Sequence, residues 1–234
     1  MPERPSPQRL IVAIDGPAGA GKSTAARLLA ERLGYALLDT GAIYRVMALR
    51  AREGGVAWDD GPGVAALADG LEIAFRLEGT VNHVLADGQD VTPAIRTPEM
   101  SDGASRVSAL PEVRAALLDL QRRIGAAGGV VVEGRDIGTV VFPNAQAKFF
   151  LTATVDERAR RRAAELRAAG RPVDPATTRA EIVARDERDS TRAAAPLRKA
   201  DDAIEIDSSA LAVEEVVDRM AAIVSRTAGG AARA

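Results

Sequence analysis

The segment Gly16-Pro17-Ala18-Gly19-Ala20-Gly21-Lys22-Ser23 constrains this chain more than any other part of the sequence. It fits the pattern G-x-x-x-x-G-K-S/T, and it lies between an apolar run at residues 11–14 and a helix-like stretch at residues 23–33. In such a strand–loop–helix unit, glycines let backbone N–H groups surround phosphate oxygens, and the helix N-terminus adds positive potential. The segment therefore predicts a binding loop for a nucleoside triphosphate.

Three side chains of this loop have expected roles. Lys22 reaches the outer phosphates, Ser23 ligates Mg²⁺, and Thr24 contacts the inner phosphates. The alternative is a glycine-rich turn that binds nothing.

The loop alone does not say which class of P-loop protein this is. A switch GTPase would need an Asn-Lys-x-Asp element, and neither Asn82 nor Asn144, the only asparagines, precedes a lysine. A motor ATPase and a small-molecule kinase both remain open at this point.

Composition excludes several other classes of protein. The chain has 234 residues, enough for one α/β domain with insertions or at most two small domains. A formal net charge of -2 argues against a polybasic surface for nucleic acid or membrane. Cysteine is absent, and we see neither a secretory signal nor a membrane-spanning run, so we expect a soluble cytoplasmic protein. Only three of the 31 basic residues are lysine, so the number of arginines says little and their placement matters.

Short apolar runs predict the core of the fold. They recur at residues 11–14, 35–38, 130–132, 149–151 and 203–206, with helix-like segments between most of them. Continuous apolar strands that alternate with helices are typical of a parallel sheet buried on both faces. The prediction is a doubly wound, five-stranded α/β domain.

Two regions depart from this alternation. Within residues 58–95, the apolar residues Leu71, Ile73, Phe75 and Leu77 alternate with other residues, mostly charged, and Gly79 supplies a turn. This region predicts a small antiparallel sheet inserted beside an acceptor site. Later, residues 156–169 and 176–195 predict two arginine-rich helices joined by a short loop.

Polar residues at the ends of predicted strands indicate a second anion site. Arg45 follows the second strand by about one helical turn, and Arg135 with Asp136 closes the third. Doubly wound sheets bind ligands at these carboxyl ends. On the second arginine-rich helix, one face carries Arg185, Arg188, Asp189 and Arg192. A kinase that acts on a phosphorylated acceptor needs such a second cationic site beside the first.

Each of these features has a structural alternative. Thr40 could simply cap the following helix while Arg45 stays solvated, and Arg135 with Asp136 could be a local salt bridge. Arg185 and Asp189 could form an exposed ion pair along the helix. The sole histidine, His83, is not expected to be catalytic, because an anionic phosphate acceptor needs no general base.

Several motifs together resemble a known family, the bacterial-type cytidylate kinases, which transfer the terminal phosphate of ATP to CMP or dCMP. The resemblance spans nearly the whole chain. It rests on Ile14-Asp15-Gly16-Pro17 before the loop, Leu38-Asp39-Thr40-Gly41-Ala42-Ile43-Tyr44-Arg45, Ile95-Arg96-Thr97, Gly134-Arg135-Asp136-Ile137-Gly138-Thr139-Val140-Val141-Phe142-Pro143, and Arg185-Asp186-Glu187-Arg188-Asp189.

The resemblance implies roles for particular residues. The acceptor phosphate is implied to be held by Arg45, Arg135 and Arg192, and cytosine to be recognised by Ser105, Arg114 and Asp136. The ribose and the rest of the acceptor are implied to lie near Arg185, Asp189, Thr40 and Tyr44. A helix that includes Arg158, Arg161 and Arg162 is implied to cover ATP. The implied catalytic residues are Lys22, Arg135, Arg188 and Arg192. A carboxylate suits the cytosine amino group, whereas uracil would place an acceptor against Asp136.

The resemblance also implies a division of the chain and a cofactor. The core comprises residues 1–39, 107–155 and 193–234, the monophosphate-binding lobe residues 40–106, and the lid residues 156–192. Mg²⁺ accompanies ATP, no organic cofactor is expected, and the protein is expected to be a monomer. Glu133 stands where some relatives carry Asp, so its role around Mg²⁺ stays open. The alternatives are a kinase of another monophosphate such as UMP, and a P-loop regulator without a small acceptor.

Overall fold

The computed structural model describes residues 9–79 and 81–231. Its elements follow the chain as β1 (Ile11–Asp15), α1 (Lys22–Leu33), β2 (Ala36–Asp39), α2 (Thr40–Glu53), α3 (Gly61–Ala66), β3 (Ile73–Glu78), β4 (Val81–Ala86), β5 (Gln89–Asp90), α4 (Thr92–Ile95), α5 (Pro98–Val107), α6 (Pro111–Gly125), β6 (Val130–Glu133), the π-helical turn η1 (Ile137–Val141), β7 (Ala147–Thr152), α7 (Val155–Ala168), α8 (Pro175–Thr191), β8 (Ile204–Asp207) and α9 (Val213–Ala231).

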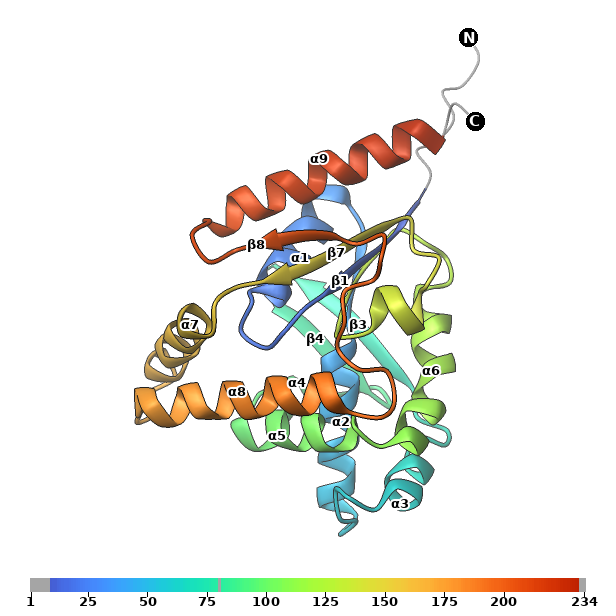
Figure 1. The fold of residues 1–234 in the computed structure, drawn as a ribbon. Helices are drawn as coiled ribbons and strands as arrows, with labels where there is room; N and C mark the ends of the chain where they lie inside the picture. Colours follow the sequence, from blue (N-terminus) through green and yellow to red (C-terminus); the bar gives the residue numbers. More distant parts are fainter. Residues whose placement is uncertain (1–8, 80, 232–234) are drawn as a thin grey trace.

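The larger sheet has five strands in the order β2-β6-β1-β7-β8, and all of its strand pairs are parallel (Figure 1). The first strand therefore lies in the middle. The chain passes from it to the edge strand β2, returns to β6 between β2 and β1, and then crosses to β7 and β8 on the other side. This arrangement confirms the predicted five-stranded doubly wound sheet.

Both faces of this sheet are covered by helices. On β1, Val12 and Ile14 pack in a layer with Leu29 of α1 and Met220 of α9, whereas Ala13 belongs to the opposite layer. The alternation follows from the pleat, which sends successive side chains to opposite faces. Helices α2, α5 and α6 contribute to that opposite layer. Among the described helices, none is long and apolar enough to cross a membrane.

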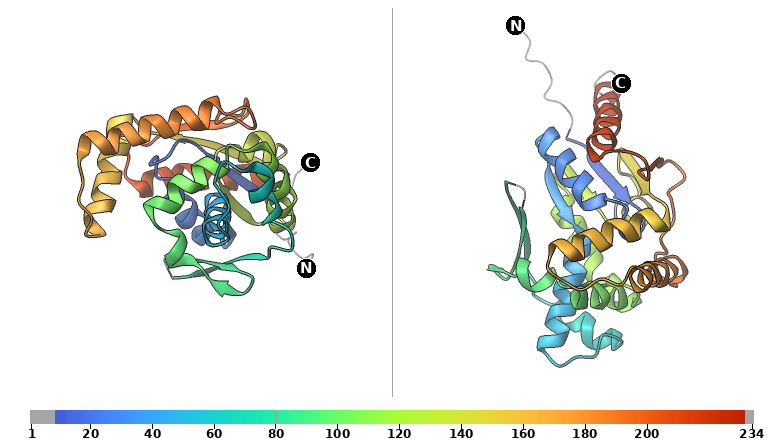
Figure 2. Two further views of the ribbon diagram at one scale, coloured as in Figure 1. Left: turned by 90° about the horizontal axis from the view of Figure 1, so that it is seen from below. Right: turned by 90° about the vertical axis from the view of Figure 1, so that its left-hand side faces the viewer.

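A second, three-stranded antiparallel sheet interrupts the α/β alternation. Its strand order is β3-β4-β5, and Figure 2 shows the β3–β4 hairpin projecting from the side of the molecule. On β3, Ile73 is buried and Phe75 packs against the core, whereas Ala74 and Arg76 are exposed. The predicted antiparallel insertion is therefore present, and one face of it is buried.

The two arginine-rich helices are present, but the second is shorter than predicted. Helix α8 ends at Thr191, whereas the sequence pattern extends to residue 195. The backbone of Arg192 is already extended, and Ala195 has a positive φ of 50° before Pro196. A proline disfavours helical conformation in the residue before it, which keeps Ala195 out of the helix, but the end at Thr191 lies beyond the reach of this effect.

Candidate active site

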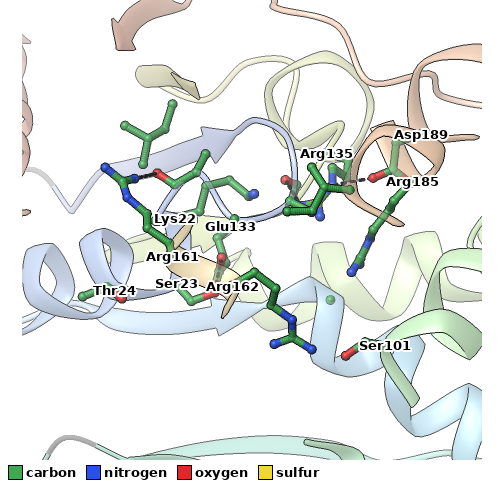
Figure 3. A pocket seen from close by; sticks show the side chains of 18 of the residues that line it. Lys22, Ser23, Thr24, Ser101, Glu133, Arg135, Arg161, Arg162, Arg185 and Asp189 are labelled. Carbon is green, nitrogen blue, oxygen red and sulfur yellow. Dashed lines mark hydrogen bonds and ion pairs between the residues drawn. The ribbon is translucent and has the colours of Figure 1, made fainter. Parts of the chain in front are cut away.

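A cavity of about 1310 Å³ opens at the carboxyl ends of the central strands. The Gly16–Ser23 segment, the P-loop, lies along one side of it, and the ends of β2 and β6 with α5, α6 and α8 form the other side. Figure 3 shows Lys22, Ser23 and Glu133 on one side and Arg135, Arg185 and Asp189 on the other. Ligands bind at this edge in open parallel sheets, so the cavity is the candidate active site.

Two glycines shape the P-loop. Gly16 has a φ of 145°, and a Cβ there would collide with the carbonyl oxygen of Leu151. Gly21 has a φ of 90° and is the N-cap of α1, and as a glycine it has no side chain to cap the first turn. The N–H groups of that turn are therefore free to bind an anion.

Lys22 is buried at the base of this loop. Its Nζ donates to the carbonyl oxygen of Pro17 at 2.7 Å. The pKa of Lys22 lies well below its usual value because the ammonium is buried, and because Arg135 repels it. Phosphate oxygens beside Nζ would stabilise the charged form. The lysine thus fits the donor side of a phosphate-transfer site.

Ser23 faces Glu133 across the junction between α1 and β6. The Ser23 hydroxyl donates to Glu133 Oε2 at 2.9 Å. Burial, together with the neighbouring charge of Asp39, raises the pKa of Glu133 to about 7. Within residues 9–79 and 81–231, no group of three or more His, Cys, Asp or Glu side chains could hold a metal alone. Mg²⁺ readily takes its remaining ligands from nucleotide phosphates and water, so Ser23 and Glu133 fit Mg²⁺ bound with a nucleotide.

Two arginines of α7 anchor this helix to neighbouring loops. Arg158 is buried, donates to the Ala18 carbonyl at 3.1 Å and pairs with Asp186 of α8 at 2.6 Å. Arg161 lines the cavity and donates to the Ser208 carbonyl at 2.6 Å. Arg158 is not among the residues that line the cavity, so its place is behind the P-loop. Arg161 and Arg162 both line the cavity, and Arg161 also lies against the P-loop, 3.4 Å from the Ala20 carbonyl.

The acceptor side is formed by ion pairs between distant elements. Arg135 Nε lies 2.8 Å from Asp189 Oδ2 of α8. Burial works to raise the pKa of Asp189, but Arg135 and Arg185 hold it below its usual value. Asp189 therefore pairs with an arginine of another element rather than with Arg185 along its own helix, and the alternative of an exposed Arg185–Asp189 ion pair is wrong. The alternative of a local Arg135–Asp136 bridge is also wrong, because Asp136 has other partners.

Those partners are Arg114 and Arg192. Arg114 Nη2 contacts Asp136 Oδ2, and Arg192 Nη2 lies 3.4 Å from Asp136 Oδ1. Arg114 also stacks over the ring of Tyr44, with 5.6 Å between its Cζ and the ring centroid. Asp136 and Arg114 thus present an acceptor and donors side by side on the wall of the cavity.

Two arginines in the cavity have incomplete hydrogen bonding. Neither Arg185 Nε nor Arg45 Nη1 has a hydrogen-bond partner among the described residues. Burial, with repulsion from Arg135, lowers the pKa of Arg185 to about 9, and burial also lowers the pKa of Arg45. An under-compensated buried cation is unfavourable unless an anion joins it. This charge distribution fits an anionic ligand.

The amino-acid sequence also matches a family model. The model described as "Cytidylate kinase" matches residues 12–226. The chain belongs to the cytidylate kinase family. The cytidylate kinase of Geobacter sulfurreducens is 56% identical over 215 residues, which is 92% of each chain. The cytidylate kinase of Symbiobacterium thermophilum is 47% identical over 221 residues, which is 94% of this chain and 98% of that one.

One solved structure supports the fold alone. An uncharacterized protein from Eubacterium ventriosum superposes with a TM-score of 0.51 at 15% identity, over 94% of this chain and 99% of that chain. The membership of this chain in the cytidylate kinase family therefore comes from sequence, and the cavity geometry adds the arrangement of its side chains.

Other residues named from the cytidylate kinase resemblance occupy different settings. Thr40, Tyr44 and Arg188 line the cavity, whereas Ser105 is buried on α5 outside the lining and lies 3.3 Å from Arg188 Nε. Thr40 does not cap α2. Its hydroxyl donates to the Glu133 carbonyl at 2.7 Å, and Asp39 is the N-cap.

Sequence reasoning assigned no role to three charged residues at this edge, namely Asp15, Asp39 and Arg96. The Asp15 carboxylate accepts hydrogen bonds from the N–H groups of Ile137 and Gly138, both at 2.8 Å, and burial raises its pKa to about 6. Both aspartates end buried strands. Charged residues at such positions are the signal that would have found the two aspartates.

Proposed function

We propose that this chain transfers the γ-phosphate of ATP to CMP or dCMP, giving ADP and CDP or dCDP, with Mg²⁺ accompanying ATP. One observation carries the proposal. A single cavity joins the P-loop to a second cationic site that includes the paired Arg114 and Asp136. The names of the relatives support the same reaction.

The donor half binds and orients the triphosphate. The P-loop N–H groups and Lys22 surround its phosphates, and Ser23 and Glu133 provide oxygen atoms toward Mg²⁺. A Mg²⁺ ion held there would supply positive charge that neutralises the phosphates. The buried Lys22 ammonium stabilises the charge that develops on the transferred group, because the surrounding protein excludes water.

The acceptor half holds the monophosphate. Arg45, Arg135 and Arg192 hold its phosphate, and all three line the cavity. Arg185, which is repelled by the charges of Arg135 and Arg45, adds positive charge near the ribose. Arg188 and Arg192 extend the cationic wall along the end of α8. The attacking oxygen belongs to an anionic phosphate, so it needs no general base, and correct placement supplies most of the rate.

Asp136 and Arg114 read the base. The carboxylate accepts from the 4-amino group of cytosine, and the guanidinium donates to the ring nitrogen and carbonyl oxygen. Uracil would set its carbonyl oxygen against Asp136, leaving two buried acceptors face to face. The pair therefore favours CMP over UMP. The buried Ser105 acts through Arg188, 3.3 Å away, rather than from the cavity wall.

Two lobes close over the nucleotides in this proposal. Residues 40–106 carry the acceptor, and residues 156–192 cover ATP with Arg161 and Arg162. Closure would exclude water from the transfer. A net charge of -2 gives little attraction for nucleic acid or anionic membranes. We expect a cytoplasmic monomer whose substrates are small nucleotides.

An acceptor panel tests the proposal. ADP release is measured with Mg²⁺-ATP and, in turn, CMP, dCMP, UMP, AMP and GMP. CMP or dCMP should give the highest kcat/KM. A higher kcat/KM for UMP would reassign the acceptor, and ATP turnover that is unaffected by any monophosphate would indicate a P-loop regulator instead.

A further inference from the structure

Arg96 lies at the boundary between the inserted sheet and the rest of the acceptor lobe. It is the C-cap of α4, directly before Thr97, which caps α5. Its side chain is 39% exposed, and it lines the same cavity as Arg45 and Arg135. The Ile95-Arg96-Thr97 motif thus places a cation beside the acceptor phosphate site, and none of the roles above uses it.

Arg96 binds a carboxylate that also faces Arg45. Asp39 Oδ1 accepts from the N–H of Ala42 at 2.9 Å and so caps α2. Asp39 Oδ2 accepts from Arg96 Nη2 at 3.1 Å, whereas Arg45 Nη1 lies 3.7 Å from the same oxygen. The separation from Arg45 is too long for a hydrogen bond. Asp39 is therefore hydrogen-bonded to Arg96, whereas its ion pair with Arg45 is longer and carries no hydrogen bond.

The charge of Asp39 explains why its hydrogen bond to Arg96 matters for Arg45. Burial works to raise the pKa of Asp39, but Arg45 and Arg96 hold it below its usual value. Asp39 is thus a buried anion that needs a counterion. While Arg96 supplies it, Arg45 keeps an Nη1 without a hydrogen-bond partner among the described residues. Without Arg96, Asp39 would draw Arg45 into a shorter, hydrogen-bonded ion pair.

We propose that Arg96 is a positioning residue for the acceptor phosphate: it holds Asp39 and thereby leaves Arg45 free to bind that phosphate. The inference rests on the proposed function, because it assigns Arg45 to the acceptor. Arg96 acts through Asp39 and does not contact the substrate. Its loss therefore weakens recognition of the phosphate and leaves recognition of the nucleoside unchanged.

The variant Arg96→Gln tests this role. We expect the KM for CMP to rise about tenfold, a loss typical of one charge-assisted contact, with kcat and the KM for ATP within about twofold of wild type. The inhibition constant of cytidine, which has no phosphate, should not change. Arg96→Lys should restore part of the loss. Arg52→Gln is the matched control, since Arg52 pairs with Glu99 on the surface of the same lobe and should leave every constant unchanged.

A double-mutant cycle separates action through Asp39 from direct contact. Asn is also a good N-cap, so Asp39→Asn preserves the start of α2 while it removes the charge. In the Asp39→Asn background, Arg96→Gln should change the KM for CMP by less than about twofold. A full tenfold effect in that background would show direct phosphate binding and overturn the inference. An equal loss of CMP and cytidine binding would also overturn it.

The two proposals fail in different ways. If wild type phosphorylates no monophosphate, the proposed function is wrong. If wild type phosphorylates CMP and Arg96→Gln keeps the wild-type KM for CMP, only the positioning role of Arg96 is wrong.

Discussion

The hydroxyl of Ser23 and the carboxylate of Glu133 lie 2.9 Å apart, where the first turn of α1 meets the end of β6. The carboxylate is buried beside Asp39, with Lys22 close enough to favour its ionised form. This place suits a Mg²⁺-nucleotide, but in the absence of one the ionised carboxylate is unfavourable. A group that serves ligand binding at the expense of stability leaves a signature in the pH dependence of unfolding.

The stability difference between Glu133→Gln and wild type should grow with pH. The pKa of Glu133 is about 7 in the folded chain against a usual 4.5, so the folded state binds the proton more tightly. Wild type therefore loses stability as pH rises from 4.5 to about 7, and glutamine does not titrate. In urea unfolding without nucleotide, the free energy of unfolding of the variant minus that of wild type should increase by about 2 kcal/mol between pH 5 and pH 8. A difference that stays constant with pH would contradict the raised pKa. Glu31→Gln, on the exposed surface of α1, is the control.

Lys22→Ala should reduce kcat by at least about a hundredfold, because the lysine stabilises charge that develops during transfer. The variant should fold, because the substitution removes the buried ammonium of Lys22, which is unfavourable in the folded state. Steady-state kinetics and circular dichroism check both statements. Lys199→Ala, at the surface, should be indistinguishable from wild type. Near-normal turnover of Lys22→Ala would exclude the proposed donor site.

Asp136→Asn should relax the preference for cytosine. The amide keeps an oxygen for Arg114 but adds a donor that suits the carbonyl oxygen of uracil. The ratio of kcat/KM for CMP to that for UMP should fall by about a hundredfold, while the KM for ATP stays unchanged. Asp156→Asn, an exposed carboxylate of α7, is the control. An unaltered CMP to UMP ratio would remove Asp136 from base recognition.

Arg158→Met should lower the free energy of unfolding by about 3 kcal/mol, because it breaks a buried ion pair with Asp186 and a hydrogen bond to Ala18. Arg160→Met, on the exposed side of the same helix, should have no measurable effect. Urea unfolding compares the two. Equal effects would mean that Arg158 does not anchor α7 to the P-loop.

The sequence was most informative where a pattern depends on neighbouring residues. The core strands were predictable because both of their faces are buried, which produces continuous apolar runs such as Val130-Val131-Val132. The P-loop was predictable because its glycines and Lys22 follow one strand and begin one helix. The β3–β4 hairpin was predictable because Ile73 and Phe75 alternate with exposed residues on a half-buried face.

Choices between competing partners were not predictable. Asp189 could pair with Arg185 one helical turn away or with an arginine from another element, and only the packing of α8 beside the end of β6 selects Arg135. Asp39 and Thr40 are both good N-caps, and the position of α2 selects Asp39. Long-range choices of this kind decide which arginines remain free for a ligand.

The most direct test of the account follows the phosphate itself. Wild-type protein, Mg²⁺, CMP and ATP labelled at the γ-phosphate are mixed, and the products are separated and counted. The account predicts that the label appears in CDP in step with ADP formation, and that most of the label still enters CDP rather than UDP when UMP competes with CMP at equal concentration. Label that appears as inorganic phosphate at the same rate with and without CMP would contradict phosphate transfer between the two halves of the cavity.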